Sequence, residues 1–273
     1  MSGLAPAAPE IDVDVPRRSF VQQVMGLPVS IHVRGPRARD DQVAKAVGLA
    51  FDGLRLDDAM FSTWLPDSPV SRLRDGRDGL ADAHPRIRHV AALCELAGHR
   101  TGGAVSAWLP GPDGVVRFDP TGLVKGWAVE QAFDGLRERL RPLGAHDALA
   151  CAGGDIVLSC ARTDTPDWVV AVEDPRDRAR ILRTLRLRTG AVATSGTAAR
   201  GAHIIDPVTG DAATGLLSAT VIGPGLAWAD VYATAAFVKG RAALGWLATL
   251  ADHAGVLVAP DGAVSTVRGL PVA

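Results

Sequence analysis

The feature that most constrains the fold of this chain is a succession of strand-like stretches in its second half. Each stretch is short, rich in β-branched and other apolar residues, and bounded by turn residues, which is typical of strands. These stretches cover residues 148–160, 168–172, 181–187, 191–194, 203–205 and 218–222. Because they do not alternate regularly with helices, they favour a largely antiparallel sheet over a doubly wound fold.

Helical periodicity marks the remaining apolar segments. We expect helices over residues 40–60, 68–73, 87–97, 124–141, 227–238 and 242–253. Strand patterns precede them at 18–24 and 29–33, and a hairpin signal closes the chain at 256–267. No linker divides these elements. The sequence therefore predicts an α+β fold in a single compact domain over residues 17–273, preceded by a disordered N-terminal arm over residues 1–16.

Composition excludes several classes of function. The chain has 29 Lys and Arg against 30 Asp and Glu, a formal net charge of -1, so we expect no nucleic-acid partner. No stretch approaches the roughly 20 apolar residues of a membrane-spanning helix, and the N-terminus lacks the apolar segment of a signal peptide. Three cysteines without C-x-x-C spacing argue against a disulfide framework or a cysteine metal site. We therefore expect a cytoplasmic location.

The segment Asp119-x-x-Gly122-x-x-Lys125-Gly126 lies between a further strand pattern, at residues 115–118, and the start of the predicted helix 124–141. Glycine lets the backbone approach a ligand, the first amides of a helix favour phosphate, and lysine adds a positive charge. The segment matches neither a Walker loop nor a dinucleotide fingerprint. A phosphate site and a plain strand-to-helix turn with a solvated lysine are both compatible with this spacing.

Two further segments combine glycine with polar residues. In Cys151-Ala-Gly-Gly-Asp155-Ile, the paired glycine interrupts a strand pattern and predicts a β-bulge or the close approach of a ligand. Asp155 can accept hydrogen bonds from neighbouring amides there. In His203-Ile-Ile-Asp-Pro-x-Thr-Gly210, the histidine can accept a proton near neutral pH. The same residues are also ordinary turn formers.

Asp230 and Thr234 lie four residues apart on the predicted helix 227–238. This spacing places the carboxylate and the hydroxyl on one helix face. A carboxylate on so apolar a helix is costly to bury unless it is paired or binds a cation. Hard oxygen ligands of this kind suit Mg²⁺, although a place at the solvent edge explains Asp230 equally well.

Taken in order, these segments resemble the ApbE family, the FAD:protein FMN transferases. The family pattern D-x-x-G-I-A-K-G-Y-A-x-D corresponds to residues 119–130, and N-x-G-G-D-I corresponds to 151–156. Three more patterns follow, namely A-x-A-T-S-G at 191–196, H-x-I-D-P-x-T-G at 203–210 and A-D-x-x-A-T-A at 229–235. The resemblance covers most of the chain from Met25 to Gly262.

The resemblance implies a Mg²⁺-dependent enzyme that moves FMN from FAD to a Thr or Ser hydroxyl of an acceptor protein and releases AMP. Such an acceptor carries a D-x-x-[ST]-x-A-[ST] motif. The implied metal ligands are Asp230, Thr234 and the backbone carbonyl of Gly122, with Ala233 nearby. The implied base is His203. The implied contacts to FAD, its flavin and its nucleotide come from Met25, Trp64, Ala104, Val105, Ser106, Asp119, Lys125 and Ile204.

The chain also departs from the family patterns. Met25-Gly26-Leu27 lacks the usual threonine after M-G, and Val105-Ser106 stands where F-D is common. Two alternatives to the transferase therefore stay open. With water as the acceptor, the same site would be an FAD pyrophosphatase that yields FMN and AMP. With turnover lost, the chain would be a non-catalytic flavin-binding or assembly protein.

Overall fold

A computed structural model of the protein describes residues 15–110, 113–197, 201 and 204–270. Its strands are β1 (Arg17–Val24), β2 (Leu27–Arg34), β3 (Trp108–Pro110), β4 (Val116–Phe118), β5 (Asp147–Ala152), β6 (Asp155–Ser159), β7 (Trp168–Asp174), β8 (Asp177–Leu187), β9 (Thr189–Gly196), β10 (Ser218–Gly223), β11 (Ala254–Val258) and β12 (Val264–Val267). Its α-helices are α1 (Asp41–Phe61), α2 (Pro69–Arg74), α3 (Pro85–Thr101), α4 (Thr121–Leu140), α5 (Leu226–Lys239) and α6 (Ala243–Leu247). Short 3-10 turns are η1 (Leu80–Asp82), η2 (Arg141–Leu143) and η3 (Gly240–Ala242).

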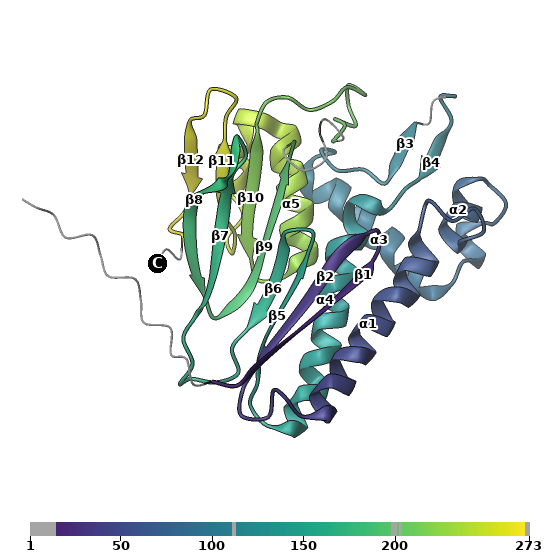
Figure 1. Cartoon of the computed structure of the whole chain (residues 1–273). Helices are drawn as coiled ribbons and strands as arrows, with labels where there is room; N and C mark the ends of the chain where they lie inside the picture. The colour runs from purple at the N-terminus through teal and green to yellow at the C-terminus, as the bar shows by residue number, and fades with distance from the viewer. Residues whose placement is uncertain (1–14, 111–112, 198–200, 202–203, 271–273) are drawn as a thin grey trace, which may run out of the picture.

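One large sheet organises the molecule (Figure 1). Its strand order is β1-β2-β5-β6-β9-β10-β11-β12, and every neighbouring pair is antiparallel. The hairpins β3–β4 and β7–β8 are not hydrogen-bonded to this sheet and form two separate two-stranded sheets. The main hydrophobic core contains buried residues from along most of the described chain, the first of them Val24 and the last Val267. The predicted α+β fold, a largely antiparallel sheet with helices in one compact domain, is therefore confirmed.

The two faces of the sheet are covered by different elements. On β9, Ala191 and Ala193 belong to the main core, together with the buried residues of α1, α4 and α5. Val192, between them, belongs to a second cluster with Val170 and Leu185 of the β7–β8 hairpin. Because successive strand residues point to opposite faces, the helices cover one face and the hairpin packs on the other (Figure 1).

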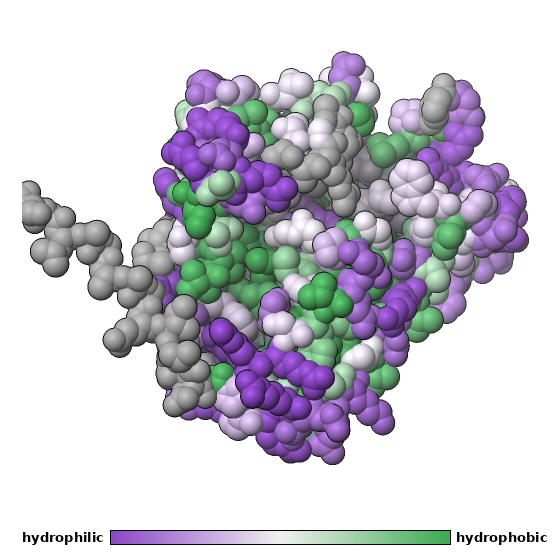
Figure 2. Space-filling model, viewed as in Figure 1, coloured by the Kyte–Doolittle hydropathy of each residue, from purple (hydrophilic) through white to green (hydrophobic). Residues whose placement is uncertain are grey.

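The hairpin covers only part of its face of the sheet. Leu149 of β5 and Ile156 of β6 pack against the second cluster but remain partly exposed. In the view of Figure 2, hydrophobic residues gather near the middle of the molecule, and hydrophilic residues predominate around its margins. In the described ranges, no helix is long and apolar enough to span a membrane.

The Gly-Gly pair of residues 153–154 forms a turn rather than the predicted bulge. Ala152 pairs with Asp155, so the two glycines are the loop of the β5–β6 hairpin. Their φ angles of 61° and 100° are positive, as two-residue hairpin turns of the primed type require. The bulge prediction was wrong because residues 148–160 are two antiparallel strands, not one interrupted strand. This turn places Asp155 at the first position of β6.

Smaller differences concern the ends of elements. The last predicted helix, 242–253, is reduced to α6, and the strand β3 was not predicted. Of the predicted strand 203–205, Ile205 forms an isolated bridge with Ala212. His203 lies outside the described residues, as does the predicted arm except for residues 15 and 16.

Candidate functional site

The candidate site begins where β4 passes into α4. Asp119 precedes the helix and accepts hydrogen bonds from the backbone N–H of Thr121, at 3.1 Å, and from its hydroxyl, at 2.6 Å. The Asp119 backbone N–H donates to the carbonyl of Ala107 at 2.7 Å, which ties the helix start to the residue before β3. These contacts fix the N-terminal turn of α4, whose free amides and dipole favour a bound anion.

Glycine at position 126 lets α4 and α5 approach closely. A Cβ atom at Gly126 would lie 2.9 Å from Asp230 Cβ and 3.0 Å from the carbonyl oxygen of Leu226. Real Cβ atoms do not approach backbone and side-chain atoms so closely, so only glycine fits without a shift of α5. This close packing places Asp230 beside Lys125, which precedes Gly126 on α4.

Lys125 lies between two buried carboxylates. Its ammonium group forms an ion pair with Asp155, and its Nζ lies 3.3 Å from Asp230 Oδ2. The side chains of Asp155 and Asp230 are 3% and 8% exposed, whereas that of Lys125 is 27% exposed. Buried carboxylates need compensation, and a single lysine supplies it to both. A bound cation could therefore replace Lys125 as the partner of these carboxylates, and a bound phosphate could replace the carboxylates as the partner of Lys125.

Backbone and hydroxyl groups of β9 complete the polar cluster. The Thr194 N–H donates to Asp155 Oδ1 at 2.9 Å, which bears out the predicted amide contact of this aspartate. Ser195 Oγ lies 2.9 Å from Thr234 Oγ1 on α5, and Thr194 Oγ1 lies 2.8 Å from Thr220 Oγ1 on β10. The predicted helix face that carries Asp230 and Thr234 therefore faces the end of β9.

Lys125, Asp155, Asp230 and Thr234 line one cavity of about 300 Å³, together with Thr194 and Ser195 of β9. The sequence-predicted residues that the cavity brings together are Ala104, Val105, Ser106, Asp119, Gly122, Lys125, Ile204, Asp230 and Thr234. They come from four separate parts of the chain, so the fold unites most of the predicted set at one place.

The other predicted residues lie elsewhere. Met25 is in the β1–β2 turn with φ 57°, and its N–H donates to Asp58 Oδ2 at 3.0 Å. Trp64 is 92% exposed and lines a separate open cavity with Arg74 and Arg117. Ala233 is fully buried in the core. The proposed base His203 cannot be placed, because it falls outside the described part.

Several residues line the cavity without having been predicted as site residues. They are Leu109, Thr121, Gly153, Asp155, Thr194, Ser195, Gly196, Ile205 and Pro207. Asp155, Thr194 and Ser195 occur in the two glycine-containing patterns 151–156 and 191–196, so the signal was present in the motifs. Cys151 begins the first pattern, and burial raises the pKa of its thiol, which argues against a nucleophilic thiolate.

The donor set of the cavity fits a hard divalent cation. Asp230 supplies a carboxylate that already faces a positive charge at 3.3 Å, and Thr234 supplies a hydroxyl one turn along the same helix. Gly122 of α4 lines the same cavity. Within the described ranges, no group of three or more His, Cys, Asp or Glu residues forms a metal cluster. Such a site would therefore depend on waters and substrate phosphates for its remaining ligands, as Mg²⁺ commonly does.

Known structures share this fold. The ApbE protein from Thermotoga maritima matches with a TM-score of 0.78 and 20% identity, over 93% of this chain and 97% of that chain. The flavin transferase ApbE from Vibrio cholerae matches with a TM-score of 0.73 and 19% identity, over 94% and 98% of the respective chains. The flavinyl transferase ApbE from Pseudomonas stutzeri matches with a TM-score of 0.75 and 19% identity, over 93% and 96%.

Sequence comparison gives the family. No curated protein sequence matches the chain. The model of the ApbE family matches residues 107–258, which include α4, α5, the β5–β6 hairpin and β9. The match thus spans the elements that supply Lys125, Asp155, Asp230 and Thr234. The chain belongs to the ApbE family.

Proposed function

We propose that the protein is a Mg²⁺-dependent FAD:protein FMN transferase. The observation that carries the proposal is the convergence of Lys125, Asp155, Asp230 and Thr234 at the N-terminus of α4. Membership of the ApbE family supports it, as do the names of two matched structures, which describe those proteins as flavin transferases.

The reaction joins an acceptor Ser or Thr oxygen to the FMN phosphorus and breaks the pyrophosphate bond, with AMP as the leaving group. The N-terminal amides of α4 and the Lys125 ammonium would bind the pyrophosphate oxygens. Asp230, Thr234 and the Gly122 carbonyl would hold Mg²⁺, which would neutralise charge on the diphosphate. The acceptor proton needs a base, and His203 is the proposed one.

The remaining residues of the cavity would bind the rest of FAD. Ala104, Val105, Ser106 and Ile204 line the same space as Lys125, and Asp119 lies at its edge with 21% of its side chain exposed. We propose contacts from these residues to the flavin and nucleotide parts, and from Met25 and Trp64 outside the cavity. A cytoplasmic location and an acceptor protein with a D-x-x-[ST]-x-A-[ST] motif belong to the same proposal and rest on the sequence.

The test incubates the purified chain with FAD, Mg²⁺ and a protein fused to the acceptor motif, and measures covalent flavin fluorescence on a denaturing gel. We expect transfer by the wild type and a loss of about 10²-fold or more in Asp230→Ala. Asp134→Ala, an exposed aspartate of α4, is the matched control and should retain transfer. Undiminished transfer by Asp230→Ala would refute the metal assignment.

Reactions without the acceptor separate the alternatives. FMN and AMP released from FAD in that arm, without labelling in the first, would identify a pyrophosphatase. Tight FAD binding with neither product nor label, under saturating Mg²⁺, would identify a non-catalytic flavin-binding protein.

A further inference from the structure

We propose that Glu130 is a positioning residue, which fixes the first turn of α5 and thereby the places of Asp230 and Thr234. The inference rests on the proposed function. Glu130 lies on α4, and the backbone N–H of Ala227, in the first turn of α5, donates to its Oε2 at 2.7 Å. The residue does not line the cavity, so it would act through the helix and not on the substrate.

The N-terminus of α5 lacks a cap of its own. Its N-cap residue is Gly225, which has no side chain to accept hydrogen bonds from the first turn. The first four N–H groups of a helix need partners from outside the helix, and here a carboxylate from a neighbouring helix supplies one. The negative charge also lies at the positive end of the α5 dipole.

The fit around Gly225 is specific to this contact. A Cβ atom at Gly225 would lie 2.4 Å from Glu130 Oε1 and 3.2 Å from its Cδ. Any larger residue there would displace the carboxylate from the helix end. The Glu130 carboxylate can therefore reach the end of α5 only because residue 225 has no side chain.

The contact sets the register of α4 against α5 at a second point. Glu130 lies one helical turn beyond Gly126, so both residues lie on the same face of α4. Gly126 faces Asp230, and Glu130 faces Ala227, about one turn earlier on α5. These two contacts act as a clamp on α5. Loss of one allows the helix to shift along or around its axis, which would move Asp230 and Thr234 relative to Lys125.

Asp57 provides a matched control for a purely structural carboxylate. It is 2% exposed, lies on α1, and accepts two hydrogen bonds from Arg86 at 2.6 and 2.8 Å. It joins α1 to the first turn of α3 and does not line the cavity. Its removal should lower stability without altering metal binding.

The experiment titrates Mn²⁺, in the presence of ADP, into wild-type protein and variants by electron paramagnetic resonance. ADP offers a diphosphate but no FMN to transfer. We expect Glu130→Ala to weaken Mn²⁺ binding by about 10-fold, which is about 1.4 kcal/mol. The KM for Mg²⁺ in FMN transfer should rise by a similar factor, with kcat at saturating Mg²⁺ little changed. Glu130→Gln keeps an acceptor oxygen for Ala227 and should restore both values to within about 3-fold of the wild type.

The outcomes distinguish this inference from the proposed function. Glu130→Ala with wild-type Mn²⁺ affinity, or Asp57→Asn with the same loss of affinity as Glu130→Ala, would overturn the positioning role while wild-type transfer stands. A wild type that neither transfers FMN nor binds Mn²⁺ with ADP would overturn both. If Glu130→Ala does not fold, Glu130→Asp decides the question, because its shorter side chain keeps the charge but not the reach, and Mn²⁺ binding should weaken again.

Discussion

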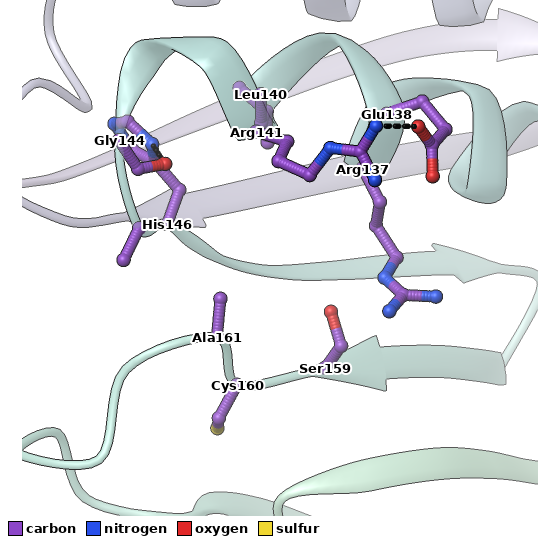
Figure 3. Close-up of a pocket in the computed structure, with 10 residues that line it drawn as sticks. Arg137, Glu138, Leu140, Arg141, Gly144, His146, Ser159, Cys160 and Ala161 are labelled. Carbon is purple, nitrogen blue, oxygen red and sulfur yellow. Dashed lines mark hydrogen bonds and ion pairs between the residues drawn. The ribbon is translucent and has the colours of Figure 1, made fainter.

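The two ends of α4 each border a cavity, and they differ in how their charges are held. The cavity at the C-terminal end, of about 400 Å³, is lined by Arg137, Glu138, Arg141, His146 and Cys160 (Figure 3). The cavity at the N-terminal end is smaller, at about 300 Å³. Of these two cavities, size alone would therefore favour the C-terminal one as the functional site.

The ion pairs at the two cavities favour the N-terminal cavity instead. Arg141 pairs with Glu138 of the preceding turn at 3.1 Å, and these side chains are 79% and 67% exposed (Figure 3). Lys125 pairs instead with Asp155 and Asp230, which lie 30 and 105 residues away in sequence and are buried. Exposed pairs between residues close in sequence are solvated and weak, whereas buried charges gathered from distant segments need a specific fold. Convergence of buried charges therefore favours the N-terminal cavity as the candidate site.

The largest expected effect comes from comparing the loss of one positively charged side chain at each end of α4, Lys125 at the N-terminal end and Arg141 at the C-terminal end. Lys125→Ala should lower FMN transfer by about 10²-fold or more, because it removes the positive charge proposed to bind the pyrophosphate. Arg141→Ala should leave transfer within about 2-fold of the wild type, because its charge is exposed and paired with Glu138, three residues earlier in the chain. The assay is covalent flavin labelling of the acceptor. Equal losses in both variants would refute the distinction between the two cavities.

The sequence predicted the elements of the site better than its contacts. Apolar periodicity located α4 and α5, and the i, i+4 spacing put Asp230 and Thr234 on one face. Both are local properties, which depend on residues within one or two helical turns. The position of Lys125 at the start of α4 was predictable for the same reason.

Contacts between elements far apart in the sequence could not be predicted from local patterns. The Lys125–Asp155 pair depends on how the β5–β6 hairpin lies against α4, and no local pattern encodes that arrangement. The glycines 153 and 154 illustrate the difficulty, since a bulge and a two-residue turn call for the same residues. Only the pairing of Ala152 with Asp155 separates the two. The Lys125–Asp155 pair follows from this turn and was missed with it, although the sequence did predict that Asp155 accepts a hydrogen bond from an amide.

Glycine substitutions offer a second comparison of the two ends. Gly126→Ala would force a Cβ to within 2.9 Å of Asp230 and 3.0 Å of the Leu226 carbonyl, so we expect a loss of about 1–3 kcal/mol in the free energy of unfolding. Gly135→Ala, nearer the C-terminal end, meets only the flexible end of Arg139, at 2.7 Å. It should be neutral or stabilise the helix by up to about 1 kcal/mol.

Urea unfolding measures both glycine variants. A Gly126→Ala variant as stable as the wild type would show that α4 and α5 can separate without cost. That result would also weaken the proposed clamp on α5.

A smaller effect concerns the pH dependence of stability. Burial raises the pKa of the Glu130 carboxyl above its ordinary value, in spite of the hydrogen bond from Ala227. As pH rises past the ordinary glutamate pKa, the unfolded chain releases this proton before the folded chain does. The free energy of unfolding therefore falls between the ordinary pKa and the raised one, by about 1 kcal/mol or less.

Glu130→Gln has no proton to release at this position, so it should not show that fall. The measurement compares urea midpoints of the variant and the wild type at several pH values between about 4 and 7. The difference between them should shift in favour of the variant as pH rises. A constant difference would contradict the raised pKa but leave the Ala227 contact in place.

The smallest expected effect is the stability of Arg141→Ala. Its ion pair with Glu138 is exposed on both sides, so removal should change the free energy of unfolding by less than about 0.5 kcal/mol. Raising the salt concentration should reduce even that change, because exposed charges are screened. A decrease of more than about 1 kcal/mol in the free energy of unfolding that persists in high salt would mean that the Arg141–Glu138 pair is not an ordinary solvated surface pair. In that case the convergence of buried charges would no longer single out one end of α4, and the C-terminal cavity would need a function of its own.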